Sequence, residues 1–359
     1  MSSFALLGSD SNSLIMTAEL SLKGFDVRLF ELEKLRSNIE PIVKEGGVEI
    51  EGAAGKGKGR FEATILSRDV LGEAEVVIVP RPTAEYLQAL GSNVSEGQIV
   101  VIAGGYFHAL NFVTNIAGKE LLTKIVVSET SMTPYAGIRK ESPTRFMVKA
   151  SKEAILMATY PASQTTTVLR KLRQAFRELE PAQNVLETSL NNLNPMFHPP
   201  ILLMSTSTVE KKGATMFLYK DGVSKSVTRV VQLLDEERLK LVSSLGFKPI
   251  SSKDWLLKMY GTDEQTLHET MVGCRAYETS RAPDKMTTYL DQDIPYGLVP
   301  IESIGRRLGL EMPSTRTMID LASMVTNNDY RHQGYSATKL GLKATTPKEL
   351  LDIATGTTK

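Results

Sequence analysis

The chain has 359 residues, more than one domain usually holds, and so predicts two domains. Its 42 basic and 41 acidic residues give a formal net charge of +1 without a basic stripe, which argues against a nucleic-acid partner and favours small-molecule ligands. The single cysteine, Cys274, excludes an internal disulfide framework and a cysteine-rich zinc site, and no metal site is expected.

Neither a membrane span nor an export leader is expected. The first residues lack a basic segment followed by an apolar block, and no apolar run reaches the roughly 18 to 20 residues that a membrane span needs. The low cysteine content also suits a reducing compartment. We therefore expect a cytoplasmic protein without a membrane partner.

The chain opens with the pattern strand, turn, helix, strand. An apolar run over residues 4–7 ends in Gly8, a polar turn follows over 9–13, and a helical pattern then stops at Gly24 before a second apolar run over 25–30. This order is that of the first unit of a doubly wound dinucleotide-binding fold. The sequence therefore predicts a Rossmann-like α/β domain at the N-terminal end.

Glu31 follows the second apolar run, roughly 20 residues after the turn, where an acidic side chain accepts hydrogen bonds from the ribose hydroxyls of NAD. A carboxylate at this position would repel a 2′-phosphate, so NAD is the favoured cofactor. Lys34 and Arg36 lie close enough in sequence to keep NADP open as the alternative.

The turn itself, GSDSNS, departs from the glycine fingerprint of dinucleotide-binding folds, because only Gly8 matches it. Asp10 would direct a carboxylate toward the phosphates, whereas the serines and Asn12 could offer donors at a helix N-terminus. The residues expected to contact the cofactor in this unit are Gly8, Ser9, Asp10, Asn12, Ser13 and Glu31.

The first half continues with alternating strands and helices. Strands are expected at 48–50, 61–66, 76–79, 99–103 and 125–127, with helices at 83–90 and 107–116. Pro80 and Gly104 follow strands and are expected near the cofactor, and Glu129 is expected just past a strand end, because ligands lie beyond the carboxyl ends of such strands. Runs at 145–148 and 154–158 predict antiparallel strands that finish the same sheet, and a helix over 168–179 leads out of a domain spanning 1–182.

The second half, residues 183–359, reads as helical. Helices are expected at 223–245, 254–260, 264–272, 298–308, 314–324 and 346–353. A polar stretch over 281–298 carries three aspartates and is expected to be a loop. The fold class is therefore a Rossmann-like doubly wound domain followed by an all-helical domain.

The stretch from Asn184 to Pro200, NVLETSLNNLNPMFHPP, starts as an amphipathic helix but contains several asparagines, which compete for backbone hydrogen bonds. Asn194 and His198 are four residues apart and share a helix face. Pro199 is expected to end the helix. The pattern alone fits either a structural histidine near a kink or an acid/base facing a cleft.

Three blocks carry a resemblance to a known family. The stretch NVLETSLNNLNPMFHPP resembles the segment with the catalytic histidine in the opine dehydrogenases, which include octopine, nopaline and carboxyethyl-norvaline dehydrogenases. The block TYLDQDIPYGLVPIESIGRRLGLEMPS resembles that family's second signature, in which an aspartate precedes a Gly-Leu-Val-Pro helix start. The ending LASMVTNNDYRHQGYSATKLGL is similar to the family's C-terminal helices, so the resemblance covers nearly the whole chain.

The resemblance implies an oxidoreductase that acts on CH–NH groups with NAD or NADP. An amino acid and an α-keto acid would form an imine, which NADH would reduce to a secondary amine dicarboxylate. His198 matches the acid/base and Asp293 the carboxylate that holds and polarises it. Asn194 is expected to orient the substrate, and Gly8 matches a cofactor position.

The chain departs from the family pattern at several positions. Thr288 stands where the family commonly has an arginine that clamps a carboxylate, and Gly334-Tyr335 replaces a Gly-Arg pair. Losing a guanidinium removes bidentate recognition of carboxylates. Either the substrate carries fewer or differently placed carboxylates, or Arg281 or Arg331 binds them instead, or the chain has lost dehydrogenase activity.

Two other functions stay open. The altered turn suits a degenerate, non-catalytic or metabolite-binding homologue with an impaired cofactor site, in which Asp293 would be an ordinary helix cap or loop residue. A reductase of hydroxy acids of the ketopantoate-reductase kind is the other, although no lysine lies among residues 194–198. The oligomeric state is also left open, with a homodimer among the alternatives.

Overall fold

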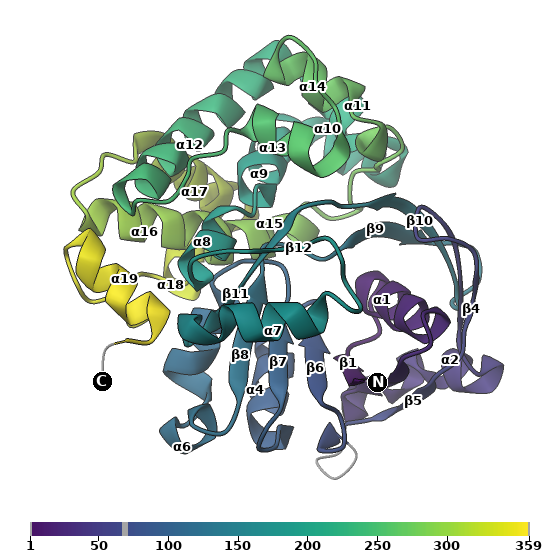
Figure 1. Ribbon diagram of the computed structural model, residues 1–359. Helices are drawn as coiled ribbons and strands as arrows, with labels where there is room; N and C mark the ends of the chain where they lie inside the picture. The colour runs from purple at the N-terminus through teal and green to yellow at the C-terminus, as the bar shows by residue number, and fades with distance from the viewer. Residues whose placement is uncertain (1, 67–70, 358–359) are drawn as a thin grey trace. The chain divides into compact units, whose positions relative to one another are not determined.

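The computed structural model describes residues 2–66 and 71–357. It divides into two compact units, residues 1–188 and 189–359. Figure 1 labels their helices and strands. Each unit is described separately.

The first unit is built on an eight-stranded sheet. Its strands are β1 (Ser3–Leu7), β2 (Asp26–Glu31), β5 (Glu62–Ile65), β6 (Val76–Val79), β7 (Ile99–Ile102), β8 (Val126–Thr130), β11 (Ile155–Tyr160) and β12 (Leu179–Pro181). The order is β12-β11-β8-β7-β6-β1-β2-β5, and β1 pairs in parallel with both β2 and β6. Two halves therefore diverge from β1, which confirms the predicted doubly wound fold and places its switch point between β1 and β6.

Helices connect these strands. They are α1 (Ser11–Leu22), α2 (Glu40–Glu45), α4 (Ala84–Asn93), α5 (His108–Asn111), α6 (Lys119–Leu122) and α7 (Thr165–Leu172), with a 3₁₀ turn η1 (Glu33–Asn38) and a π turn η2 (Phe112–Ile116). Helix α7 packs against β11 and β12, on the near side of the sheet in Figure 1. Helix α8 (Val185–Leu190) crosses the boundary between the units.

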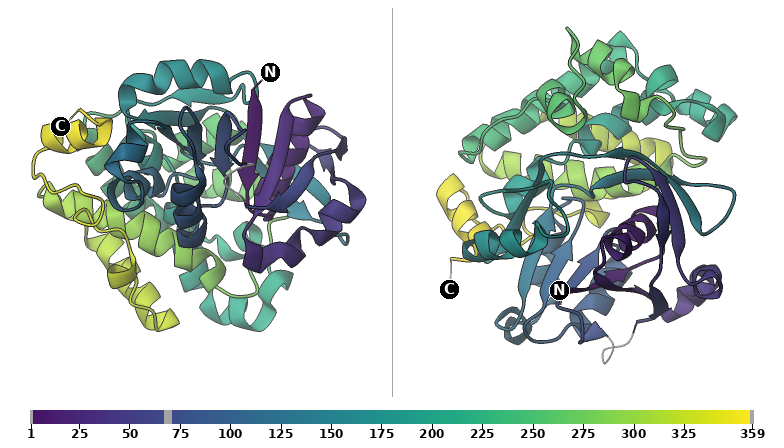
Figure 2. Two further views of the ribbon diagram at one scale, coloured as in Figure 1. Left: turned by 90° about the horizontal axis from the view of Figure 1, so that it is seen from below. Right: turned by 45° about the vertical axis from the view of Figure 1, so that its right-hand side comes forward.

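A second sheet, in the order β4-β3-β10-β9, was not predicted. It consists of β3 (Val48–Gly52), β4 (Gly57–Gly59), β9 (Tyr135–Arg139) and β10 (Arg145–Ser151). The expectation that 145–148 would finish the main sheet is wrong, because β10 pairs with β3 and β9. Figures 1 and 2 show α1 enclosed by this curved sheet.

Close packing of α1 explains the glycines of the second sheet. A Cβ atom on Gly59 would lie 2.4 Å from the Cα atom of Ala18, and one on Gly137 would lie 2.3 Å from Cδ1 of Ile15. The contact at Gly59 is with backbone and cannot be relieved, so only glycine lets β4 approach the helix this closely, whereas at Gly137 the Ile15 side chain would have to move. The second sheet thereby fixes the helix that follows the Gly8 turn.

Two further expectations for the first unit are corrected. The helix predicted over 168–179 ends at Leu172, and Leu179 begins β12, which pairs in parallel with β11. Glu129 lies within β8, because that strand continues to Thr130. Its carboxylate is fully buried, where it accepts hydrogen bonds from the backbone N–H of Ala109 at 3.1 Å and the hydroxyl of Thr188 at 2.7 Å.

The second unit is helical, as predicted. Its helices are α9 (Asn194–Met204), α10 (Thr206–Lys212), α11 (Leu218–Gly222), α12 (Lys225–Ser244), α13 (Ser252–Tyr260), α14 (Leu267–Gly273), α15 (Thr287–Asp293), α16 (Val299–Arg307), α17 (Pro313–Thr326), α18 (Tyr330–Gln333) and α19 (Pro347–Thr355). Helix α9 packs against α11, α12, α15 and α17 and forms the centre of this unit.

The prediction that Pro199 ends a helix is wrong. Helix α9 runs through Pro199 and Pro200 to Met204, and the break in the Asn-rich stretch falls earlier, between α8 and α9. Each proline removes one backbone hydrogen bond. Phe197 and Ile201 beside them are fully buried, and this packing offsets the loss.

The expected loop over 281–298 is also corrected. Helix α15 occupies Thr287–Asp293, a π turn η6 follows over Ile294–Leu298, and α16 begins directly at Val299. Proline is tolerated at the first turns of helices, so Pro295 and Pro300 do not interrupt this segment. Over the two described ranges, no helix combines the length and apolar character needed to cross a membrane.

Candidate active site

His198 and Asp293 come together in the second unit. His198 lies on α9 and Asp293 is the last residue of α15, a helix that packs against α9. Nδ1 of the imidazole lies 2.9 Å from Oδ2 of the carboxylate, and the two side chains are 13% and 1% exposed. Among the described residues, the imidazole bonds through Nδ1, which leaves Nε2 available for a proton transfer.

A tyrosine on α15 also contacts the imidazole. The ring of Tyr289 stacks on His198 with centroids 4.6 Å apart and planes inclined by 20°. Tyr289 and Asp293 are four residues apart on one helix face, so one helix supplies both the ring contact and the carboxylate. The edge of Tyr219 approaches from another side, at 6.4 Å between centroids. These contacts fix the ring in position.

Burial keeps Tyr219 neutral. Its ring stacks on Tyr277 at 3.8 Å, and burial raises the pKa of the Tyr219 phenol well above its ordinary value. A phenol that stays protonated cannot serve as a base. The ionisable pair of this site is therefore His198 and Asp293.

The chain beyond Asp293 is held by a close backbone contact. The N–H of Tyr335 donates to the carbonyl of Pro295 in the π turn at 2.9 Å. A Cβ on Gly334 would lie 2.6 Å from that same carbonyl oxygen and 2.8 Å from the carbonyl oxygen of Tyr330. Only glycine fits here. π turns often occur at functional sites, and this one follows the carboxylate directly.

Asn194 and His198 are the two partly exposed positions within 191–200, where the other residues are buried. Asn194 begins α9, and its backbone N–H donates to Oδ1 of Asn192 at 3.1 Å. The two side chains share a face of α9 that reaches solvent, as their spacing predicts.

The residues predicted to bind a substrate carboxylate are either exposed or engaged in other contacts. Thr288 is exposed in the first turn of α15, next to Tyr289. Arg331 is engaged elsewhere: its Nε donates to Oδ1 of Asp320 at 2.9 Å, and a further nitrogen lies 3.7 Å from Glu302. The Arg281 guanidinium lies 3.7 Å from the ring centre of Phe217. Either arginine would have to leave protein contacts to bind a substrate carboxylate.

In the first unit, the turn after β1 forms a helix cap. Gly8 has a φ of +98°, which favours glycine and gives the tight turn that the fold requires. Asp10 is the N-cap of α1, and its carboxylate accepts the N–H of Asn12 at 2.9 Å and the hydroxyl of Ser13 at 2.6 Å. Two of the donors expected to face phosphate, the N–H of Asn12 and the hydroxyl of Ser13, are therefore bonded to Asp10, because an Asp side chain satisfies a helix N-terminus well.

Glu31 ends β2, as predicted, and is 1% exposed. Its carboxylate accepts three hydrogen bonds from the protein: the hydroxyl of Ser9 at 2.5 Å, the hydroxyl of Tyr86 at 2.6 Å and the N–H of Leu32 at 2.7 Å. Pro80 follows β6 and is buried. These groups gather at the carboxyl ends of neighbouring strands, where the fold binds nucleotides.

Gly104 lies one strand further on, after β7. Its φ is +107°, and its N–H donates to the carbonyl of Thr130 at 3.1 Å.

The two cations near Glu31 are paired within the protein. Lys34 bonds Glu85 at 2.5 Å and Arg36 bonds Glu33 at 3.0 Å. Either side chain would have to leave its ion pair to bind a 2′-phosphate.

The framework of the first unit suits a dinucleotide. The strand order, the φ of Gly8 and the carboxylate at the end of β2 are those that a dinucleotide requires. Within this frame, Asp10 caps the helix end that would face phosphate, and Tyr86 bonds the carboxylate that would face ribose. When bound, a nicotinamide dinucleotide supplies a hydride.

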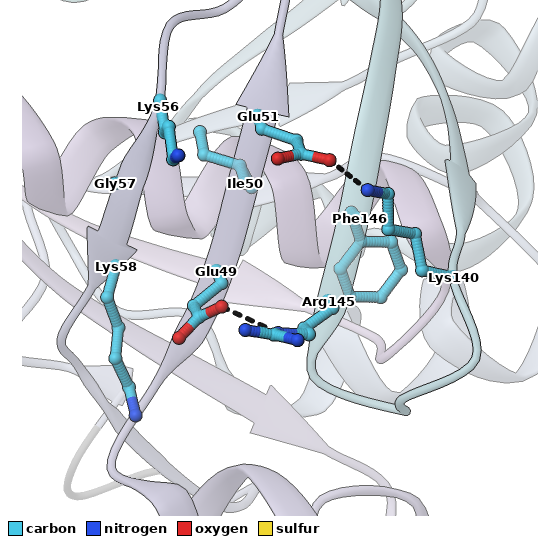
Figure 3. A pocket seen from close by; sticks show the side chains of 9 residues that line it. All are labelled: Glu49, Ile50, Glu51, Lys56, Gly57, Lys58, Lys140, Arg145 and Phe146. Carbon is cyan, nitrogen blue, oxygen red and sulfur yellow. Dashed lines mark hydrogen bonds and ion pairs between the residues drawn. The ribbon is translucent and has the colours of Figure 1, made fainter.

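Figure 3 shows a hollow of about 440 Å³ on the second sheet, lined by strands β3, β4 and β10. Four cations and two carboxylates line it, and Nε of Arg145 lies 2.7 Å from Glu49 while Lys140 pairs with Glu51. Exposed ion pairs of this kind contribute little to stability. The hollow is a solvated surface and belongs to neither of the two residue groups above.

Sequence reasoning missed Tyr86 and Tyr289. The spacing of Tyr289 and Asp293 was a usable signal, but the segment was expected to be a loop, where spacing carries no meaning. Tyr86 and Glu31 are 55 residues apart, and no local pattern joins them. Within the described ranges, no three His, Cys, Asp or Glu side chains are grouped to hold a metal ion.

Comparison with known proteins supports one family. Residues 181–326 match the family model described as NAD/NADP octopine/nopaline dehydrogenase, alpha-helical domain. The opine dehydrogenase of Arthrobacter sp. (strain 1C) is 27% identical over 96% of each chain, and the protein ocs of Agrobacterium tumefaciens (strain Ach5) is 24% identical over 99% of this chain and 100% of its own.

The fold agrees with a solved member of that family. The structure of an octopine dehydrogenase in complex with NADH and agmatine has a TM-score of 0.76, with 16% identity, over 100% of this chain and 99% of that chain. The chain is thus similar to the opine dehydrogenases, in its helical part by the family model and over its whole length by these relatives.

Proposed function

We propose that this protein is an opine-type dehydrogenase, an oxidoreductase that uses NADH, with NADPH as the alternative, to condense an amino acid reductively with an α-keto acid. The amine and the carbonyl form an imine with loss of water, and hydride and a proton then give a secondary amine dicarboxylate. The observation that carries this proposal is the contact of 2.9 Å between His198 and Asp293 on a helical domain of this family.

The proposed chemistry assigns roles to the ring atoms of His198. Asp293 accepts the N–H at Nδ1, which fixes the tautomer and stabilises the imidazolium. Nε2 then serves as the site of proton transfer in both steps. It supplies a proton to the carbonyl oxygen, which leaves as water, and a proton to the imine nitrogen. Tyr289 holds the ring plane, and Asn194 on the same face of α9 is proposed to orient the substrate.

Thr288 implies a substrate preference. Without the guanidinium that the family commonly places there, a substrate carboxylate loses a bidentate partner. We infer that Thr288 contributes a hydroxyl to substrate binding and that Arg331 is available only if it leaves Asp320. Residues Gly8, Ser9, Asp10, Asn12, Ser13, Glu31, Pro80 and Gly104 are proposed to border the cofactor.

The proposed setting is the cytoplasm, where NADH and α-keto acids are both available and the single thiol of Cys274 stays reduced. A homodimer remains a prediction, which sedimentation at several protein concentrations would test.

One observation favours a second function, that of a metabolite-binding homologue without catalysis. The Asp10 cap and the Tyr86 hydroxyl engage groups that a dinucleotide would use. A titration with NADH followed by fluorescence, and then absorbance at 340 nm with pyruvate and a panel of amino acids, separates the two. Binding with turnover supports the dehydrogenase, whereas no binding of NADH or NADPH at millimolar concentration supports the second function.

A further inference from the structure

One side chain from α4 covers the turn after β1. A Cβ atom on Gly8 would lie 3.3 Å from both Cζ and the hydroxyl oxygen of Tyr86, so the phenol ring end lies directly over this glycine. Gly8 is buried as a result, although the fold requires its backbone to approach a pyrophosphate. Tyr86 therefore stands where the adenosine end of a dinucleotide approaches the strand.

The same phenol uses the acceptor that a ribose needs. Tyr86 donates to Oε1 of Glu31 at 2.6 Å, and that oxygen also accepts the N–H of Leu32, while Oε2 accepts the hydroxyl of Ser9. A ribose hydroxyl bound to Glu31 would be a donor of the same kind at the same atoms. The phenol hydroxyl is thus a chemical substitute for a ribose hydroxyl.

The residue before Tyr86 makes a second contact. Glu85 pairs with Lys34 in η1 at 2.5 Å, and because both side chains are more than half exposed this ion pair contributes little to stability. The start of α4 is therefore joined to the end of β2 by two neighbouring side chains. Tyr86 is nevertheless only partly buried, so its ring has a direction in which to leave.

We propose that Tyr86 is a plug in the adenosine subsite, which must leave Glu31 and Gly8 before a dinucleotide binds. This inference rests on the proposed function only in taking a nicotinamide dinucleotide as the ligand. Because part of the binding energy is spent on opening, the plug lowers the affinity for ligands that carry the adenosine ribose. Ligands without that ribose are unaffected.

The test compares Tyr86→Phe with the wild type. Phenylalanine lacks the hydrogen bond to Glu31 that holds the ring over Gly8, so the carboxylate is open to ribose and the ring leaves the turn at a lower cost. A hydrogen bond to a charged group of ordinary strength corresponds to about tenfold in affinity. We expect Tyr86→Phe to bind ADP-ribose and NADH about tenfold more tightly by calorimetry, and to leave the affinity for reduced nicotinamide mononucleotide unchanged.

Tyr160→Phe is the matched control. Tyr160 ends β11 and pairs with Val127 near the start of β8, whereas Gly8 follows the carboxyl end of β1, so the two positions lie at opposite ends of the strands. Its substitution should leave both affinities unchanged. A crystal structure of the wild type with ADP-ribose should show the Tyr86 ring moved away from Glu31.

Several results would overturn the proposal. These are unchanged or weaker binding of ADP-ribose by Tyr86→Phe, an equal gain for the mononucleotide, or failure of both proteins to bind ADP-ribose. The proposed reaction fails in a different way, namely when a protein that binds NADH shows no turnover with any amino acid and keto acid. The two ideas can therefore fail separately.

Discussion

The ring of Tyr289 lies nearly parallel to the imidazole of His198, with centroids 4.6 Å apart and planes inclined by 20°. Such a contact between two ring faces favours one orientation of the imidazole. Asp293, one turn further along α15, bonds Nδ1 of the same ring. Two residues of one helix thus act on one acid/base.

Replacing Tyr289 by leucine should lower kcat about tenfold, because the imidazole loses its stacking partner but keeps Asp293. Tyr289→Phe should restore kcat, because it keeps the ring. Phe25→Leu, which alters an aromatic pair of the first unit, is the control. A wild-type kcat for Tyr289→Leu would show that the stack does not orient the imidazole.

Substitution of the pair itself should have larger effects. His198→Ala and Asp293→Asn are each expected to lower kcat by about 10² to 10⁴, the usual contribution of acid/base catalysis. The affinity for NADH, measured by fluorescence, should not change. Because both residues serve one proton transfer, the double variant should be little worse than His198→Ala. Full turnover by His198→Ala would show that another group handles the proton.

The predictable parts of the fold were those with local signals. Alternation of apolar runs and helical patterns indicated the doubly wound sheet, in which the neighbours β1 and β2, and β6 and β7, are each joined by a single helix. The second sheet was missed because β3 and β10, both expected as strands, are far apart in sequence, although they pair in parallel. Such pairing depends on the packing of α1 and not on either segment alone.

The candidate site was likewise predictable only in part. His198 and Asp293 were indicated by family-like blocks, whereas their contact depends on how α9 and α15 pack. Helix α15 was mistaken for a loop because prolines and aspartates are common in turns. Tyr86 reaches Glu31 only through the tertiary fold.

Thr288→Arg tests the missing carboxylate clamp. A guanidinium in the first turn of α15 would offer a substrate carboxylate two parallel hydrogen bonds, which we expect to lower the KM for the keto acid about tenfold. The value of kcat should change little, because the added contact is the same in the ground and transition states. Thr287→Arg, on a different face of α15, is the matched control. Equal effects of both variants would point to general electrostatic attraction.

His108 predicts a dependence of stability on pH in the first unit. Burial lowers the pKa of this imidazole to about 3, whereas the unfolded chain has a value of about 6.5. Between these values the unfolded state binds more protons, so stability rises with pH and is lost as the pH falls from 6.5 toward 3. Lowering the pH from 6 to 5 should cost about 1 kcal/mol through this group.

The free energy of unfolding at the two pH values measures this contribution. His108→Gln should lose the dependence that His108 causes, while His332→Gln, at an exposed position, should retain it. An identical slope in His108→Gln and the wild type would show that His108 is protonated when folded.

Gly334→Ala should destabilise the second unit and disturb Asp293. The new methyl group would lie 2.6 Å from the carbonyl oxygen of Pro295 and 2.8 Å from that of Tyr330, and backbone atoms yield less readily than side chains. Overpacking of this degree costs about 2 kcal/mol. Because Pro295 belongs to the π turn that follows Asp293, kcat should fall even at temperatures where the variant is folded.

Gly273→Ala is the control, because its methyl group would meet nothing closer than 3.7 Å, and it should change neither stability nor kcat. Thermal unfolding and turnover measured on the same samples check both effects, and a Gly334→Ala variant with wild-type stability would mean that the π turn can move aside.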